Sequence, residues 1–383
     1  MKKRRILFIS GRRADYSRIK PIMREVQSAK KLELLLVVTG MHLLKDFGET
    51  RRIIKKDGFK VDATIPMFSN KDKDDGATMT RAFGKVLQGL PDVFIKLKPD
   101  VVFCGFDLDA HLAAAITGMH MNIHVAHIQG GERSGTIDEV LRHACTKFAH
   151  LHFVATNESK RRVIKLGEDS KYVFNVGSPS LNTIKTIKYP SKEKILKQFN
   201  LDPKKKLIIF LQHPVTTEVD DAQKQISQSI QAIKSINKKH DTQAISIYSN
   251  NDAGGKRIIS QLKKSGIKVV PHIILEDFMR LMKHADVLVG NSSSGIHEAP
   301  SFKLPTVNVG TRQQHRERGK NVLDVDYDKQ KIEKAIEKCL FDKTFIKKVQ
   351  SGTNPYDNGD TAKKVVKILE KIKLPNIQKV ITY

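Results

Sequence analysis

Short runs of consecutive apolar residues alternate along the chain with segments in which apolar residues recur every three or four positions. The runs are Arg5–Ser10, Leu32–Thr39, Pro99–Gly105, Ile123–Ile128, His152–Ala155 and Tyr172–Val176 in the first half, and Lys206–Leu211, Gln243–Tyr248, Ile267–Val270, Val287–Val289 and Thr306–Val309 in the second. Continuous runs of this length, separated by segments of helical period, are typical of parallel strands buried on both faces. The pattern predicts an α/β protein with doubly wound sheets.

The alternation stops at Gly177–Asn182 and then begins again. We therefore expect an N-terminal Rossmann-like domain over residues 1–180 and a C-terminal Rossmann-like domain over residues 181–362, with a helix and tail over 363–383. Two such domains would face each other across a cleft, with ligands beyond the carboxyl ends of the strands. We expect the sugar and the catalytic groups on the N-terminal side and the nucleotide on the C-terminal side.

The composition excludes several classes of protein. Of 383 residues, 39% are hydrophobic and 28% are charged, which excludes a disordered chain. No apolar run approaches the roughly 18 residues of a membrane helix, and the apolar run after the basic start is too short for a signal peptide. The three widely spaced cysteines indicate neither a disulfide framework nor a zinc cluster. We expect a cytoplasmic protein without a metal or a membrane partner.

The net charge of +27 invites a nucleic-acid partner. However, the lysines are spread from end to end, aromatic residues make up 6% of the chain, and there is no tryptophan to stack on bases. An acidic small substrate in a basic cleft would use part of the same charge. We therefore expect no nucleic-acid partner.

Polar residues follow the first and third predicted strands. The loop Gly11–Arg18 has neither the dinucleotide fingerprint nor the phosphate loop with a lysine, but Arg13 stands just before a helix. Arg13 could bind a phosphate or form a surface pair with Asp15. Asp107 and Asp109 directly follow the strand that ends at residue 105, and either could instead cap the next helix.

The segment Gln129–His143 carries two adjacent glycines and several ionisable residues. Paired glycines after a strand allow the backbone to approach a ligand closely. Asp138 and Arg142 are four residues apart, on one face of a helix that begins near Thr136. They could act as a proton-transfer group and its orienting residue, or form an ion pair of little energetic consequence.

Two segments of the second half suggest the rest of a site. His213 follows the first strand of this half, where a histidine can be catalytic or structural. The segment Gly290–Pro300 places small hydroxyl residues and a glycine where backbone N–H groups can bind an anion. Glu298 could accept hydrogen bonds from ribose hydroxyls, and Arg312 follows the last predicted strand and can add positive charge.

Six motifs, in this order, carry a resemblance to a known family. They are Arg13–Ser17 with Pro21–Met23, Gly130–Asp138, Gln212–Thr217, Asn250–Gly254, Gly290–Ser293 and Gly310–Gln313. The chain resembles the hydrolysing UDP-N-acetylglucosamine 2-epimerases of sialic-acid synthesis from about Arg4 to Ile368. The epimerase half of the animal bifunctional epimerase/kinase is especially similar.

The resemblance implies the glycosyltransferase-B fold and a reaction in two steps. Enzymes of this kind eliminate UDP from UDP-N-acetylglucosamine to leave a 2-acetamidoglucal, and then add water to give N-acetylmannosamine. The resemblance implies a nucleotide sugar as the partner and no cofactor. It also implies a homo-oligomer, either a dimer or a tetramer. Loss of the diphosphate and abstraction of the C2 proton agree with the basic and acidic residues at the strand ends.

The resemblance also assigns roles to individual residues. The nucleotide and substrate contacts that it implies are Arg13 and Ser17 for the diphosphate, Ser292 and Ser293 for the phosphate turn, Glu298 for the ribose, and Gln129, Arg142, Asn250 and Arg312 elsewhere in the site. It implies that His213 is the active-site histidine and that Asp138 takes part in proton transfer.

The chain departs from the family pattern at two positions. Relatives often have Gly-Asp where Phe106 and Asp107 follow the glycine here, and Glu where Gln129 stands. A Gln side chain cannot shuttle a proton, so the acid and base would be found among Asp138, Glu132 and Asp107. These departures leave open a GDP-linked or 2,4-diacetamido sugar as substrate, as well as a non-hydrolysing epimerase.

Overall fold

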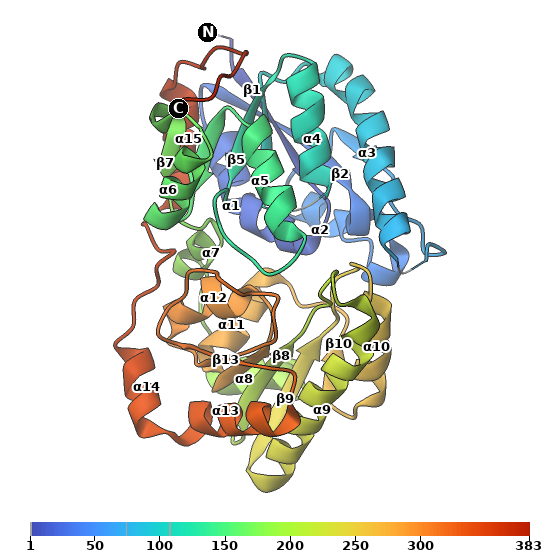
Figure 1. Cartoon of the computed structure of the whole chain (residues 1–383), viewed down its shortest axis with the longest axis vertical. Coiled ribbons are helices and arrows are strands. Elements are labelled where there is room, and N and C mark those ends of the chain that lie inside the picture. The colour runs from blue at the N-terminus through green and yellow to red at the C-terminus, as the bar shows by residue number, and fades with distance from the viewer. Residues whose placement is uncertain (1, 74, 107–108) are drawn as a thin grey trace.

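The computed structural model of the chain describes residues 2–73, 75–106 and 109–383, apart from the side chain of residue 46. Within this part, two parallel sheets lie one above the other along the long axis of the molecule (Figure 1). The first has seven strands in the order β3-β2-β1-β4-β5-β6-β7, and the second has six in the order β10-β9-β8-β11-β12-β13. These sheets confirm the α/β class with doubly wound topology that the apolar runs predict.

The first sheet comprises β1 (Arg4–Ser10), β2 (Leu32–Thr39), β3 (Ala63–Ile65), β4 (Val101–Gly105), β5 (His124–Ile128), β6 (Leu151–Val154) and β7 (Val173–Asn175). The second comprises β8 (Lys206–Leu211), β9 (Thr242–Ile247), β10 (Lys268–Val270), β11 (Val287–Gly290), β12 (Thr306–Val309) and β13 (Val322–Val325). The sequence pattern does not predict β3 and β13. The first of these is three residues long and the second is only partly buried, so neither carries a continuous apolar run.

Helices cover both faces of each sheet (Figure 1). Those of the N-terminal region are α1 (Arg13–Ser28), α2 (Arg51–Lys56), α3 (Gly76–Leu97), α4 (Asp109–His120), α5 (Asp138–Phe148), α6 (Asn157–Lys165) and α7 (Ser180–Thr186). The later ones are α8 (Lys192–Gln198), α9 (Ala222–Lys239), α10 (Gly255–Lys264), α11 (Leu275–His284), α12 (Ser294–His297), α13 (Lys329–Phe341), α14 (Lys343–Gln350) and α15 (Thr361–Lys371). None of the helices described here is both long enough and apolar enough to span a membrane.

Each sheet has an apolar core on both of its faces. In the first sheet, Phe8 of β1 and Phe103 of β4 lie with ring centroids 4.7 Å apart, below α1 and α15. On the opposite face, Leu7 and Val102 pack with Val86 of α3. This two-sided burial is the physical reason that the strands are apolar at every position rather than at alternate ones.

The last helix returns to the first domain. Helix α15 packs against α1, and its residues Val365 and Leu369 belong to the same core cluster as Val26. Arg4 donates a hydrogen bond to the carbonyl of Ile372 (3.0 Å), which ties the start of β1 to the end of α15. In Figure 1, α15 accordingly lies along the edge of the N-terminal domain and ends near both chain ends.

Candidate active site

A cavity of about 270 Å³ lies between the two domains. Its walls come from the segments after β1, β8, β9, β10 and β11, and the β1 and β8 segments lie where the strand order of each sheet reverses. The predicted site residues that line it are Arg13, Ser17, Asp138, His213, Asn250, Ser292, Ser293, Glu298 and Arg312. Gln129, Glu132 and Arg142 are buried and are not part of this lining. Asp107 lies outside the described residues.

The loop between β1 and α1 is organised by a buried carboxylate, Asp15. It accepts hydrogen bonds from the backbone N–H groups of Gly11 (2.8 Å) and Arg12 (3.0 Å), from Ser10 Oγ (2.9 Å) and from His111 Nε2 (3.0 Å). Burial alone would raise the pKa of Asp15, but the hydrogen bond and charge of His111 hold that pKa below its usual value. Asp15 therefore fixes the start of α1 and is not a surface partner for an arginine.

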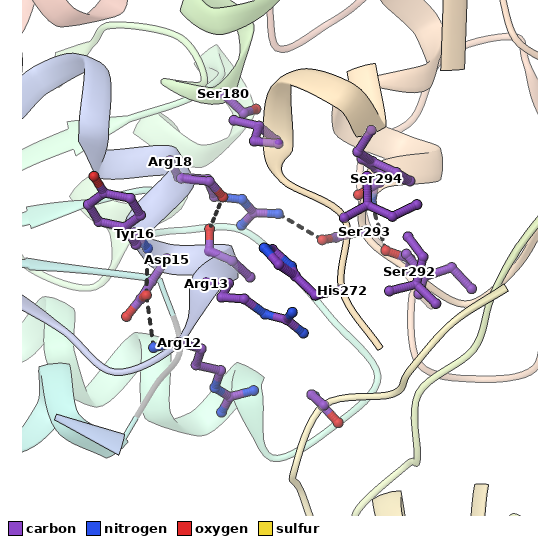
Figure 2. A pocket seen from close by; sticks show the side chains of 18 of the residues that line it. Arg12, Arg13, Asp15, Tyr16, Arg18, Ser180, His272, Ser292, Ser293 and Ser294 are labelled. Carbon is purple, nitrogen blue, oxygen red and sulfur yellow. Dashed lines mark hydrogen bonds between the residues drawn. The ribbon is translucent and has the colours of Figure 1, made fainter. Parts of the chain in front are cut away.

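Arg13 points from this loop into the cavity, beside His272 (Figure 2). One of its nitrogens, Nη2, donates to the carbonyl of Pro271 (3.3 Å), while Nη1 is buried without a partner among the described residues. His272 Nε2 is likewise buried and unpartnered there. Burial lowers the pKa of Arg13 to about 10 and that of His272 to about 4, so at pH 7 the former is charged and the latter neutral. Unmet buried donors are costly, and an anionic ligand would satisfy the guanidinium.

The turn after β11 forms the opposite wall. Gly290 has a φ of +126°, and a Cβ there would lie 2.2 Å from the carbonyl oxygen of Leu211, so a side chain would push the turn away from β8. Ser292 Oγ accepts from the N–H of Ser294 (3.3 Å). Glu298, which is 2% exposed, has an Oε2 atom without a partner in the described part of the chain. This wall can therefore offer N–H donors to a phosphate and an acceptor to a hydroxyl.

Two arginines that the motifs did not single out span the cleft. Arg18 donates to Ser293 Oγ (2.8 Å; Figure 2). Its guanidinium lies 5.3 Å from the ring centroid of Phe106. Arg12 forms an ion pair with Asp252 (Nη2 to Oδ1, 3.2 Å). No pattern in the sequence identifies these contacts, because they depend on how the two domains are placed.

His213 is held as a neutral hydrogen-bond donor. The N–H of Asn250 donates to His213 Nδ1 (3.2 Å), which leaves the ring proton on Nε2. Asn291 fixes the backbone, since its side chain accepts from the His213 N–H (2.7 Å) and donates to the His213 carbonyl (2.9 Å). Burial, followed by the charges of Arg312 and Arg12, holds the pKa of His213 well below its usual value. The ring therefore suits donation to an anionic oxygen better than proton abstraction.

Asp138 at the start of α5 meets the other domain. Its Oδ2 lies 3.3 Å from Nη2 of Arg312. Nearby, the N–H of Gly135 donates to the Arg312 carbonyl (3.0 Å), and a Cβ at Gly135 would lie only 1.9 Å from the carbonyl oxygen of Thr311. The absence of a side chain at residue 135 thus permits the contact that brings this carboxylate and arginine together.

Arg142 of α5 is bonded to the loop that precedes this helix. Its side chain is 1% exposed and donates to the carbonyl of Glu132 (2.9 Å) and to Ser134 Oγ (3.2 Å). The orienting arginine that we predicted for Asp138 from the spacing of four residues is thus bonded to the preceding loop, and Arg312 contacts Asp138 from across the cleft.

Asp109 is a further carboxylate near the cleft. It begins α4 directly after β4, and burial raises its pKa to about 6. The charge of Arg12 opposes this rise, whereas the carboxylates of Asp252 and Asp138 add to it.

Comparison with known proteins agrees with this geometry. A sequence model described as UDP-N-acetylglucosamine 2-epimerase matches residues 24–370. A UDP-N,N'-diacetylbacillosamine 2-epimerase (hydrolyzing) of Legionella pneumophila is 37% identical over 97% of both chains. A UDP-N-acetylglucosamine 2-epimerase of Neisseria meningitidis is 33% identical over 97% of this chain and 96% of its own.

Solved structures share the whole architecture. The crystal structure of a UDP-GlcNAc 2-epimerase from Neisseria meningitidis bound to UDP-GlcNAc superposes with a TM-score of 0.81 at 19% identity, covering 95% of this chain and 99% of that one. A Methanocaldococcus jannaschii structure with UDP-GlcNAc and UDP gives 0.76 at 22% identity over 95% and 99% of the two chains. These matches confirm the predicted glycosyltransferase-B type of fold.

Proposed function

Because the chain belongs to the UDP-N-acetylglucosamine 2-epimerase family, we propose that it is a hydrolysing 2-epimerase. Family membership bears out the resemblance that the six motifs carry. In the proposed reaction, UDP is eliminated from UDP-N-acetylglucosamine, and the resulting glycal is hydrated to N-acetylmannosamine for synthesis of a sialic-type acid. The protein would act in the cytoplasm as a homo-oligomer, without a cofactor, because the reaction exchanges only protons and water.

The observation that carries this proposal is a set of buried polar atoms around the cavity without partners among the described residues. They are Arg13 Nη1, His272 Nε2 and Glu298 Oε2. In the proposed complex, Arg13 and the turn at Ser292 and Ser293 bind the diphosphate, and Glu298 accepts from the ribose hydroxyls. Such donors stabilise the charge that develops on the leaving group, which is where they contribute to catalysis.

The proton-transfer steps fall to a carboxylate of the N-terminal domain that lines the cavity. Asp138, oriented by Arg312 at 3.3 Å, would take the proton from C2 as the C1–O bond breaks. His213, which is neutral, would donate a hydrogen bond from Nε2–H to the departing diphosphate and keep its proton. Water then adds at C1 and a proton returns to C2 on the opposite face, and Asp109, whose pKa burial raises to about 6, is the candidate for this proton donor.

The reaction in D₂O tests the proposal. With UDP-N-acetylglucosamine we expect UDP, free N-acetylmannosamine and one deuterium at C2, read by mass spectrometry. Release of UDP without deuterium at C2 would contradict the elimination mechanism. Formation of UDP-N-acetylmannosamine without free sugar would instead indicate a non-hydrolysing epimerase.

A second substrate class is favoured by the apolar side of the cavity. Met41, Ile53 and Phe106 line it on the N-terminal side, and Phe106 stands where relatives often have an acid. A 2,4-diacetamido-6-deoxy sugar presents a methyl group and a second acetamido group that would suit such a surface. The L. pneumophila relative is named for such a substrate, and a Campylobacter jejuni relative at 33% identity is named for its GDP- and UDP-linked forms. Comparison of kcat/KM across a panel of UDP- and GDP-linked sugars distinguishes these substrates.

A further inference from the structure

A buried polar network joins the two domains outside the lining of the cavity. Gln129, on the turn after β5, places its amide nitrogen 2.9 Å from Glu132 Oε1 and 3.3 Å from His297 Nδ1. His297, at the end of α12, places Nε2 3.0 Å from Glu132 Oε2. The three residues are 2%, 3% and 0% exposed, and the Glu132 carbonyl also accepts from Arg142.

The chemistry of the three groups defines where each hydrogen lies. An ionised Glu132 can only accept, so the Gln129 amide faces it with its NH₂ group and has a second hydrogen for His297 Nδ1. His297 Nδ1 is then an acceptor, and its Nε2–H donates to Glu132. Burial lowers the pKa of His297, although the negative charge of Glu132 opposes this. Burial alone would raise the pKa of Glu132, but His297 and Arg316 together outweigh it, so the pKa of Glu132 is lowered. A charged carboxylate next to a neutral imidazole satisfies both residues.

The surrounding groups are consistent with this neutral histidine. Arg316 lies 3.5 Å from Glu132 Oε2 and supplies the positive charge that the buried carboxylate requires. The Tyr356 ring stacks on His297 with centroids 4.2 Å apart, and burial raises the pKa of its phenol, which stays uncharged. The charges of Arg316 and Arg18 further disfavour an imidazolium at His297.

The network holds a segment that carries catalytic chemistry. We call residues 129–138 the docking loop, because it contacts the C-terminal domain at several points. Beyond Glu132, these contacts include the hydrogen bond from Gly135 N–H to the Arg312 carbonyl (3.0 Å), that from Arg316 Nε to the Arg133 carbonyl (3.1 Å) and the ion pair of Asp138 with Arg312 (3.3 Å). On the other side, His297 directly precedes Glu298, which lines the cavity.

We infer that Gln129 is a positioning residue that fixes His297 as the neutral Nε2–H tautomer and so keeps the docking loop in one register against α12. One consequence of this inference is that Asp138 and Glu298 keep a constant relative position across physiological pH. Only the importance of that consequence for catalysis rests on the proposed function. Its structural content, the tautomer of one buried histidine, stands independently of substrate.

A carboxylate at residue 129 would change this arrangement. Two carboxylates about 2.9 Å apart cannot both stay charged without a proton or a cation between them. In a Gln129→Glu variant, His297 would therefore take up a proton and lie as an imidazolium between two carboxylates. The contact between the domains would then titrate, with a coupled pKa that belongs to the group of three residues.

The test uses the full-length chain labelled with ¹⁵N-histidine and long-range ¹H–¹⁵N correlation from about pH 5.5 to 8.5, the range in which an ordinary histidine titrates. Among the neutral Nε2–H histidines that stay unchanged throughout, one signal should be lost in His297→Asn. If that variant does not fold, Tyr356→Leu identifies the signal, because removal of the stacked ring shifts it. In Gln129→Glu the same signal should become that of an imidazolium at pH 7, whereas the exposed control Gln223→Glu should match the wild type.

Three results would overturn the inference: a wild-type His297 that titrates with an ordinary pKa, an Nδ1–H tautomer, or a His297 signal that Gln129→Glu leaves unchanged. The activity readout is kcat against pH. Gln129→Glu should reduce kcat by about 10- to 100-fold, increasingly so as the pH rises and the bridging proton is lost, with a smaller change in KM. Equal losses of kcat at all pH values would also contradict it. If the wild type turns over no nucleotide sugar, the proposed function fails while the NMR result still decides this inference.

Discussion

Asp109 is expected to make the stability of this protein depend on pH in a way that can be measured. It begins α4, and the next residue, Ala110, has its Cβ 3.6 Å from the position of a Cβ at Gly11, so the carboxylate lies beside the loop between β1 and α1. Burial is the main reason that its pKa is raised to about 6, and the nearby carboxylates of Asp252 and Asp138 add to it. Replacement by Asn removes the titration and keeps the shape.

The magnitude follows from this pKa. The rise from the ordinary 3.8 to about 6 is about two units, or about 3 kcal/mol, and partial exposure of the side chain reduces the expected effect to about 2 kcal/mol. Between the two pKa values the folded chain keeps a proton that the unfolded chain loses. The free energy of unfolding therefore falls as the pH rises from about 4 to about 6 and is constant with respect to this group above that range.

Urea unfolding of the wild type and of Asp109→Asn, followed by circular dichroism at about pH 4.5 and 7.5, measures the effect. Because the unfolded carboxyl group is already mostly ionised at about pH 4.5, we expect the variant to gain about 1 kcal/mol relative to the wild type between the lower and the higher pH. The matched control is Asp241→Asn, whose side chain is 75% exposed, and its difference should stay within about 0.5 kcal/mol. An equal difference between Asp109→Asn and the wild type at both pH values would refute the reasoning.

Four further substitutions test the site. His213→Ala should reduce kcat by about 100-fold while the melting temperature changes little, and loss of the folded state would show that the histidine is structural. Asp138→Asn should abolish deuterium incorporation at C2 but leave UDP binding intact by calorimetry; unchanged exchange would assign the base to another carboxylate. Gly135→Ala places a Cβ 1.9 Å from the Thr311 carbonyl oxygen, so kcat should fall by about 100-fold without unfolding of either domain; normal turnover would show that this contact does not position the site. Arg18→Ala removes a contact across the cleft and should raise KM more than it lowers kcat, and the reverse pattern would place Arg18 in the chemical step.

Much of the fold could be predicted from the sequence, because a strand that is buried on both faces requires a continuous run of apolar residues. Strands β1, β2, β8 and β12 have the bounds of their apolar runs to within one residue. The missed strand β13 shows the limit, because its partly exposed residues carry no such run. The return of α15 to the first domain was also beyond prediction, since an amphipathic helix does not specify which apolar surface it will cover.

The candidate site likewise has features that could be predicted from the sequence and features that could not. The positions of His213 and of the serine turn follow from where strands end, since the carboxyl ends of parallel strands meet at one edge. The predicted pairing of Asp138 with Arg142 also came from local spacing, and here the structure places Arg312 against Asp138 instead.

The sequence by itself therefore determined two parallel sheets, the strand-end segments that surround a cleft, and the family to which the chain belongs. The tertiary structure decided which side chains act together. Arg18 with Ser293, Asp138 with Arg312 and Gln129 with His297 are 275, 174 and 168 residues apart, and each pair joins one domain to the other. Periodicity records which face of an element is buried, but hydrogen bonds of about 3 Å depend on how two folded domains dock.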